Sequence, residues 1–350
     1  MKKIIPYILI IIVLFIGAGL YLQSTKNSDK PLLPVSFKNS DNEAEELTIN
    51  SPPEKLIKNY GAAPDFSGND KWFNSDPLNI EQLKGKVVLI DFWTYSCINC
   101  IRTLPYLTEW YEKYKDDGLV IVGVHTPEFA FEKVASNVDS AIKKYNITYP
   151  VAQDNNYKTW NAYSNQYWRA NYLIDKNGSV VYTHFGEGNY DVTEKAIRTL
   201  LGLEGTFETS AQESKNQAGT PEIYFGLARL NNYGGVEKPS NSAQSFSLPA
   251  KLNANQFALE GNWVFNQEAA VHSNGLGRIR LNFNAAKVFM VAQSKEPATI
   301  KVYVDGQFTK SLVVSSSDLY ELYNSEAGGS HTLEIEVPEE NFEAFTFTFG

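Results

Sequence analysis

The chain has 350 residues, a formal net charge of −9 and two cysteines. A net negative charge without a basic block argues against binding to nucleic acid or to an anionic membrane surface. The four histidines form no closely spaced pair and the cysteines form a single CxxC, so the ligands that tetrahedral zinc requires are not in place. We therefore expect neither a nucleic-acid partner nor a metal.

The N-terminus predicts a membrane anchor. Lys2 and Lys3 precede an uncharged stretch at residues 4–22, which as a helix extends about 28 Å, close to the ~30 Å hydrocarbon core of a bilayer. The positive-inside rule places the lysines in the cytoplasm and the bulk of the chain outside the cell membrane. We expect a single-pass transmembrane anchor at residues 1–23 and a polar, flexible tether at residues 24–54. A cleaved signal peptide is the alternative.

The two cysteines, Cys97 and Cys100, directly follow an apolar run at residues 87–92 that predicts a buried strand. Apolar residues at helical spacing over 101–111 then predict a helix with Cys97 near its N-terminus. Unpaired N–H groups and the helix dipole stabilise a thiolate there, so Cys97 is the expected nucleophile. Cys100, one turn deeper, is expected to resolve the mixed disulfide. A structural disulfide is the alternative, although so short a loop gains little from closure.

Asp91 lies inside the apolar run, where a lone carboxylate is costly unless it has a role. A raised pKa would suit it as the proton acceptor for Cys100. The alternative is an inert, hydrogen-bonded carboxylate at a strand edge.

Two further domains follow the tether. Strand and helix signals alternate over residues 55–204 and predict an α/β domain with a sheet between helices. Polar residues at 205–220 predict a linker. Over 221–350 apolar and polar residues alternate, and Asp305-Gly306 is typical of a hairpin turn. We expect a separate all-β domain there, a β-sandwich or jelly roll.

Several motifs of the α/β domain resemble the TlpA-like, extracytoplasmic thiol-disulfide oxidoreductases, and the DipZ group most closely. They occupy residues 88–107, 123–129, 149–154, 160–175 and 185–190. The resemblance implies a thioredoxin fold, with a mixed sheet flanked by helices, and a redox-active disulfide between Cys97 and Cys100. It also implies no cofactor, and electron exchange with protein thiols and disulfides and with a membrane thiol carrier of the CcdA/DsbD type.

The β domain resembles the C-terminal module of the same group through residues 220–226, 261–263, 304–306 and 345–350. That module is similar to carbohydrate-binding folds, but a fold does not establish a ligand. Trp263, Tyr224 and Tyr303 are candidates for stacking on a glycan. Burial in the core, or docking of the β domain against the redox domain, is the alternative.

Arg169 stands where relatives with this fold place a cis-proline facing the thiols. A cis bond before a non-proline residue costs about 3–4 kcal/mol, so we expect a trans bond between Trp168 and Arg169. Trp168 and Arg169 are expected to bind substrate beside the thiols, with Arg169 stabilising the Cys97 thiolate. A plain exposed arginine is the alternative.

Two other functions remain open. Thr94 and Arg169 match the positions of peroxide-binding residues in peroxiredoxins, although Ile90 stands where the peroxiredoxin motif has proline. A thiol peroxidase that uses Cys97 is therefore one alternative. A non-catalytic binding scaffold carried by the β domain is the other.

Overall fold

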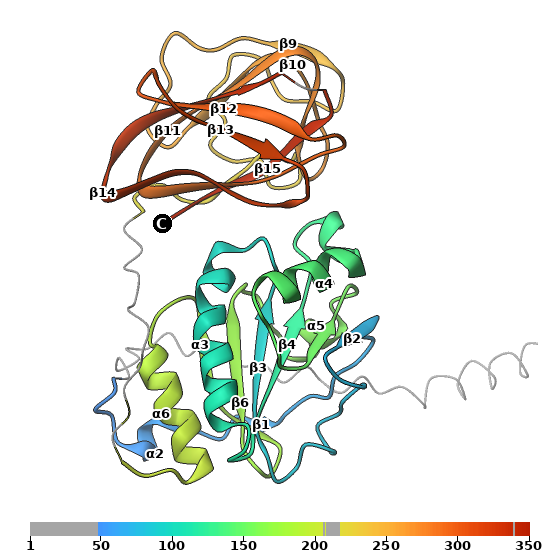
Figure 1. Cartoon of the computed structure of the whole chain (residues 1–350), viewed down its shortest axis with the longest axis vertical. Coiled ribbons are helices and arrows are strands. Elements are labelled where there is room, and N and C mark those ends of the chain that lie inside the picture. The colour runs from blue at the N-terminus through green and yellow to red at the C-terminus, as the bar shows by residue number, and fades with distance from the viewer. Residues whose placement is uncertain (1–47, 206, 208–217, 339) are drawn as a thin grey trace, which may run out of the picture.

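The computed structural model describes residues 48–205, 207, 218–338 and 340–350. They form an α/β domain and an all-β domain that follow one another along the long axis of the molecule (Figure 1). The expected anchor at 1–23 and most of the tether and linker lie outside these residues. Within the described part, no helix combines the length and apolar character needed to cross a membrane.

The α/β domain is built on a seven-stranded sheet with the order β1-β7-β6-β3-β4-β5-β2. The strands are β1 (Gly61–Ala62), β2 (Lys71–Phe73), β3 (Val87–Trp93), β4 (Leu119–His125), β5 (Val151–Gln153), β6 (Ala170–Ile174) and β7 (Ser179–Phe185). β3 runs parallel to β4 and antiparallel to β6. The sheet is therefore mixed, as expected.

Helices cover both faces of this sheet. They are α2 (Pro53–Leu56), α3 (Ile98–Tyr114), the 3-10 helix η2 (Ala130–Lys133), α4 (Ala135–Lys144), α5 (Lys158–Ala162) and α6 (Tyr190–Leu201). Because successive side chains of a strand point to opposite faces, Leu89 and Trp93 of β3 pack in the core with α3 and α6. Ile90 and Phe92 pack on the other face with α5. Asp91 shares the register of Leu89 and therefore lies on the α3 side.

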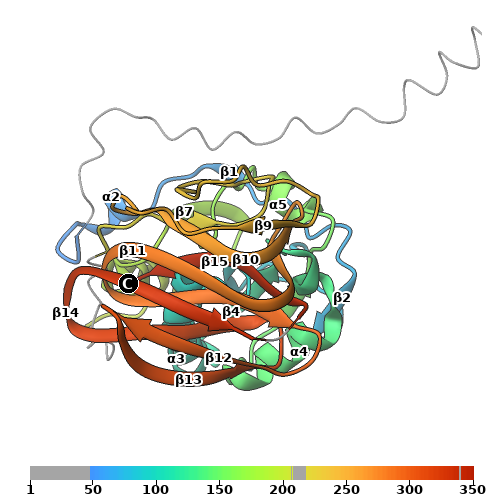
Figure 2. The same ribbon diagram turned by 90° about the horizontal axis from the view of Figure 1, so that it is seen from above.

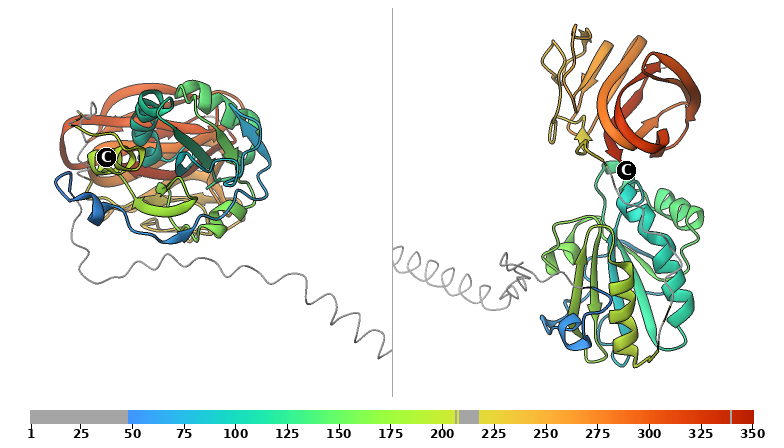
Figure 3. Two further views of the ribbon diagram at one scale, coloured as in Figure 1. Left: turned by 90° about the horizontal axis from the view of Figure 1, so that it is seen from below. Right: turned by 90° about the vertical axis from the view of Figure 1, so that its left-hand side faces the viewer.

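The second domain is all-β, as expected, and its strands form one eight-stranded hydrogen-bonded sheet. They are β8 (Ile223–Tyr224), β9 (Gln244–Phe246), β10 (Phe257–Phe265), β11 (Ala270–Ser294), β12 (Ala298–Val304), β13 (Gln307–Val314), β14 (Asp318–Val337) and β15 (Phe342–Phe349). The sheet curls around its own apolar core (Figure 3). Asp305 and Gly306 both have positive φ, 50° and 77°, and form the expected turn between β12 and β13.

A bulge in β15 joins the two domains. Thr346 pairs with Val291 and Ala344 with Ala292, so Phe345 is the extra residue of the bulge. Its ring leaves the β-domain core and packs on Phe129 and Phe131, with centroid separations of 5.2 and 4.9 Å. One apolar cluster therefore runs from the α/β domain into the β domain, which lies over it in Figure 2.

Replacing Phe345 by alanine removes this bridging ring and leaves a cavity between the domains. We expect Phe345→Ala to lower the free energy of unfolding by about 3 kcal/mol in a denaturant titration. Phe308→Ala is the matched control because the Phe308 side chain is 57% exposed, and it is expected to change stability little. Equal effects of the two variants would contradict a buried junction at Phe345.

Candidate active site

The two thiols lie where β3 leads into α3. Cys97 is the N-cap of α3 and its Sγ accepts a hydrogen bond from the backbone N–H of Cys100, with N and Sγ 3.4 Å apart. Cys97 is half-buried and Cys100 is 1% exposed, and both are free thiols in this structure. The N-terminal N–H groups and the helix dipole therefore act on Cys97, as the sequence predicts.

Cys100 is held as a neutral thiol. Burial raises its pKa well above the ordinary value, and its hydrogen bond with Cys97 and the charges of Cys97 and Asp91 act in the same direction. A buried thiol of this kind is a poor first nucleophile. It can act as a nucleophile only after a neighbouring group has accepted its proton.

Asp91 is nearly inaccessible and is paired with the neighbouring strand. It lies directly opposite Asn171 in the β3–β6 register, and Asn171 Nδ2 donates to Asp91 Oδ1 at 2.7 Å. Burial raises the pKa of Asp91 to about 6, although the charge of Arg169 and the hydrogen bond from Asn171 lower it. The expected upward shift is therefore present, and its cause is desolvation.

The structure corrects two expectations about Arg169. The Trp168–Arg169 peptide bond is cis, so the expected trans bond is wrong. The side chain is fully buried, which excludes the plain exposed arginine and a docking role on the surface. Its guanidinium donates to Asn171 Oδ1 and to the Gly186 carbonyl, and its Nε lies 3.9 Å from Asp91 Oδ1. The Asp91 carboxylate makes burial of the Arg169 guanidinium possible, because burial of either ion alone is far more costly than burial of the pair.

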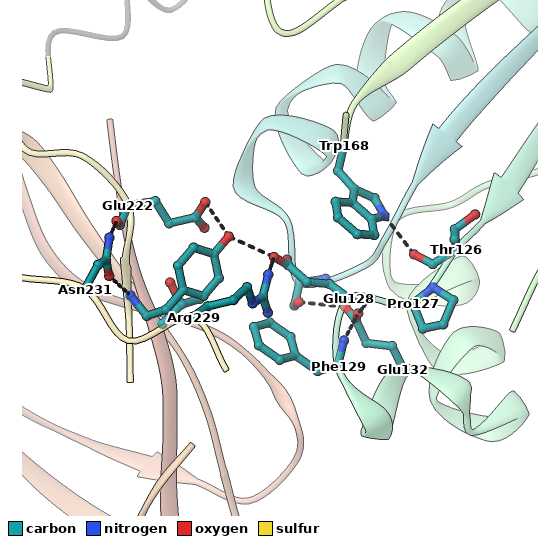
Figure 4. Close-up of polar contacts among 12 residues, drawn as sticks. Thr126, Pro127, Glu128, Phe129, Glu132, Trp168, Glu222, Arg229 and Asn231 are labelled. Carbon is teal, nitrogen blue, oxygen red and sulfur yellow. Dashed lines mark hydrogen bonds and ion pairs between the residues drawn. The ribbon is translucent and has the colours of Figure 1, made fainter. Parts of the chain in front are cut away.

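Trp168 remains at the edge of the site. Its indole Nε1 donates to the Thr126 carbonyl at 2.8 Å (Figure 4). Its ring packs against Trp160. The half-buried ring packs against the same apolar cluster as Cys97. A substrate-binding role for Trp168 stays a prediction.

Thr94 is engaged away from the thiols. Its Oγ1 lies 3.3 Å from His125 Nε2, and both side chains are fully buried. Burial lowers the pKa of His125 to about 3, so this imidazole is neutral. The hydroxyl and the guanidinium that the peroxidase alternative requires are thus both committed to other partners.

Comparison with known proteins agrees with this geometry. Residues 61–183 match the AhpC/TSA family, and residues 220–350 match the thioredoxin like C-terminal domain. DipZ of Mycobacterium tuberculosis is 39% identical over 84% of this chain, and the match spans 44% of DipZ. The thiol-disulfide oxidoreductase ResA of Bacillus cereus is 34% identical over 39% of this chain and 76% of ResA.

The chain belongs to the thioredoxin-like thiol-disulfide oxidoreductases. Among solved structures, a thioredoxin-like protein in its oxidized form shares 29% identity at a TM-score of 0.38, covering 41% of this chain and 97% of the other. The chain spans a little under half the length of DipZ.

The α/β domain also carries a buried carboxylate that sequence reasoning missed. Glu132 of η2 is fully buried and accepts hydrogen bonds from Ser96 Oγ at 2.7 Å and from the Phe129 N–H at 3.0 Å. Burial raises the pKa of Glu132 to about 7, and the charge of Glu128 adds to the shift. Glu132 therefore holds the residue that immediately precedes Cys97. An acid directly after the apolar Phe131 was the available signal.

The β domain of the oxidoreductase is attached to the loop that carries Glu132. Glu128 Oε1 accepts from Tyr224 Oη at 2.8 Å and from Arg229 Nη1 at 2.6 Å, and Tyr224 Oη also lies 2.8 Å from Glu222 Oε2 (Figure 4). The Arg229 guanidinium lies over the ring of Phe129. Docking between the domains is therefore what the structure shows for Tyr224.

The other two glycan candidates have different surroundings, and glycan binding stays a prediction for the half-buried Tyr303. Trp263 is fully buried and donates its indole N–H to the Glu260 carbonyl. Tyr303 donates its hydroxyl to Glu336 at 3.1 Å. The expectation that Trp263 stacks on sugar is corrected, because the core of the β domain takes its ring.

Glu132 makes stability depend on pH. Its pKa is raised on folding, so the folded chain binds more protons than the unfolded chain between pH about 4.5 and 7, and stability falls as pH rises through that window. We expect Glu132→Gln to flatten the decline by up to about 3 kcal/mol in denaturant titrations at several pH values. Exposed Glu81→Gln is the control. An unchanged slope in Glu132→Gln would contradict the assignment.

Proposed function

We propose that this protein is a membrane-anchored, extracytoplasmic thiol-disulfide oxidoreductase that exchanges electrons between its CxxC pair and the disulfides or dithiols of other proteins. The observation that carries the proposal is the position of the two sulfurs. Cys97 caps α3 and is accessible, whereas Cys100 lies beneath it and is closed to solvent. Cys97 is thus placed to attack a substrate disulfide, and Cys100 to displace the substrate from the mixed disulfide.

The first step is attack by Cys97. Its thiolate forms a bond to one sulfur of a substrate disulfide, the substrate S–S bond breaks, and the departing substrate thiolate takes a proton from water. The N–H groups at the start of α3 stabilise the Cys97 anion before the attack. The product is a mixed disulfide between Cys97 and the substrate.

The second step resolves that mixed disulfide. The Asp91 carboxylate accepts the Cys100 Sγ proton, and the resulting thiolate attacks Cys97 Sγ. The Cys97–Cys100 bond forms, the bond from Cys97 to the substrate breaks, and the second substrate thiolate leaves. The substrate gains two electrons and the pair loses two. The reverse sequence oxidises a dithiol, and a difference of ~30 mV in reduction potential changes the equilibrium tenfold.

The pair must be restored after each turnover by a separate thiol protein, because the chain has two cysteines and both are used. A membrane thiol carrier of the CcdA/DsbD type suits an oxidoreductase held at the membrane. Lys2, Lys3 and the uncharged residues 4–22 support the anchor, with the redox domain outside the cytoplasm.

Cysteine variants test the division of labour. Cys97→Ser is expected to abolish reduction of insulin disulfides by the dithiothreitol-reduced protein, and Cys100→Ser to accumulate a mixed disulfide visible on a non-reducing gel. Hydrogen peroxide turnover of the wild type should not exceed that of Cys97→Ser. Insulin reduction by Cys97→Ser, or rapid peroxide turnover by the wild type, would contradict the proposal.

Localisation has its own test. The full chain is expected in the membrane fraction of intact cells, with Cys97 labelled by a membrane-impermeant maleimide added from outside. Deleting residues 1–23 should leave the chain in the soluble fraction. Labelling of the full chain only after lysis would place the thiols on the wrong side of the membrane.

A further inference from the structure

A buried cation lies next to the carboxylate that receives the Cys100 proton. Arg169 is fully buried, and a guanidinium in that position is tolerated only when its donors and its charge are matched. Its Nη1 and Nη2 donate hydrogen bonds to the Gly186 carbonyl and the Asn171 side chain, whereas Nε makes no hydrogen bond and is matched only by the charge of Asp91, 3.9 Å away. The Tyr190 ring faces the guanidinium, 5.5 Å from its centroid.

Asn171 connects this cation to Asp91 with a fixed polarity. The amide oxygen accepts from Arg169, so the amide nitrogen is the end that points to Asp91 Oδ1, 2.7 Å away. An amide held this way offers a donor to the carboxylate. A donor stabilises the anion over the neutral acid, so Arg169 and Asn171 act on Asp91 in the same direction.

Among the residues that the structure describes, the other charged and titratable groups around this pair do not supply a second cation to Asp91. Cys100 in α3 and Tyr149, which lies just before β5, both interact electrostatically with Asp91. On the Arg169 side, His184 is neutral, because burial and the nearby guanidinium lower its pKa to about 4. The Arg169 charge also acts to lower the pKa of Tyr182 and of Glu187, and Glu187 forms an ion pair with Arg102.

We propose that Arg169 is a positioning residue for the resolving step, which orients Asp91 through Asn171 and favours the anionic carboxylate that accepts the Cys100 proton. This inference rests on the proposed function, in which the Cys100 proton passes to Asp91 and the thiolate then attacks Cys97. Arg169 touches neither sulfur in this scheme, and its effect is confined to the ionisation and orientation of Asp91.

A chromogenic aromatic disulfide separates the two steps. Reduced protein is mixed with it in a stopped-flow instrument. Attack by Cys97 releases the first coloured thiolate, and displacement by Cys100 releases the second. The rate of the second phase is measured from pH 5 to 9 for the wild type and the variants. The first phase reports whether the fold and Cys97 are intact.

The second phase of the wild type is expected to rise with a midpoint near the Asp91 pKa of about 6. Arg169→Gln should raise this midpoint by about one to two pH units, because an opposite charge at this range shifts a carboxyl by that amount. At pH 7 its second phase should be roughly two- to tenfold slower. Arg169→Lys should recover most of the shift, and Arg198→Gln, which removes an α6 arginine bonded to Tyr114, should change nothing.

An unchanged midpoint in Arg169→Gln, with a normal first phase, overturns the inference. If that variant does not fold, Asn171→Ala decides, because loss of the amide donor must also raise the midpoint.

Asp91→Asn distinguishes the inference from the proposed function, because this variant should remove the pH step near 6 altogether. If the pH step persists in Asp91→Asn, Asp91 is not the proton acceptor. If the step is lost in Asp91→Asn but its midpoint is unchanged in Arg169→Gln, only the role of Arg169 is refuted.

Discussion

The structure depends on how polar and ionisable groups are held at the end of the sheet where β3 leads into α3. Cys97 Sγ accepts a backbone N–H at the N-terminus of α3, and Asp91 is held by Asn171 and Arg169. Both arrangements are built around β3, which is buried along its whole length. Cys100 lies in the first turn of α3, where burial raises its pKa well above the ordinary value.

The β domain shares its attachment with the active site. Glu132 of η2 holds Ser96, the residue before Cys97, and Glu128 and Phe129, just before η2, contact the β domain through Arg229. The strand ends that carry the thiols are therefore the ends that face the second domain in Figure 1. Residues 128–132 thus contact both the β domain and the residue that precedes Cys97.

Local patterning in the sequence was sufficient for β3, α3 and the cap at Cys97, because apolar periodicity and a helix start are local properties. It failed for Arg169, whose burial depends on a carboxylate contributed by another strand. It also gives no sign that Phe345 lies at the domain junction, because a bulge reverses the direction of a side chain without changing the alternating pattern. Trp263 was misplaced for a related reason: alternation marks the buried face of a strand but gives no sign that an aromatic on it is wholly enclosed.

The central claim is that one sulfur is accessible while its neighbour is buried and held as a neutral thiol, and differential alkylation tests it most directly. The reduced, folded chain is treated with iodoacetamide at neutral pH, and the two cysteines are followed separately by peptide mass spectrometry. The account predicts rapid labelling of Cys97, with Cys100 labelled only after the chain is unfolded. Equal labelling of the two cysteines in the folded chain, or faster labelling of Cys100, would contradict it.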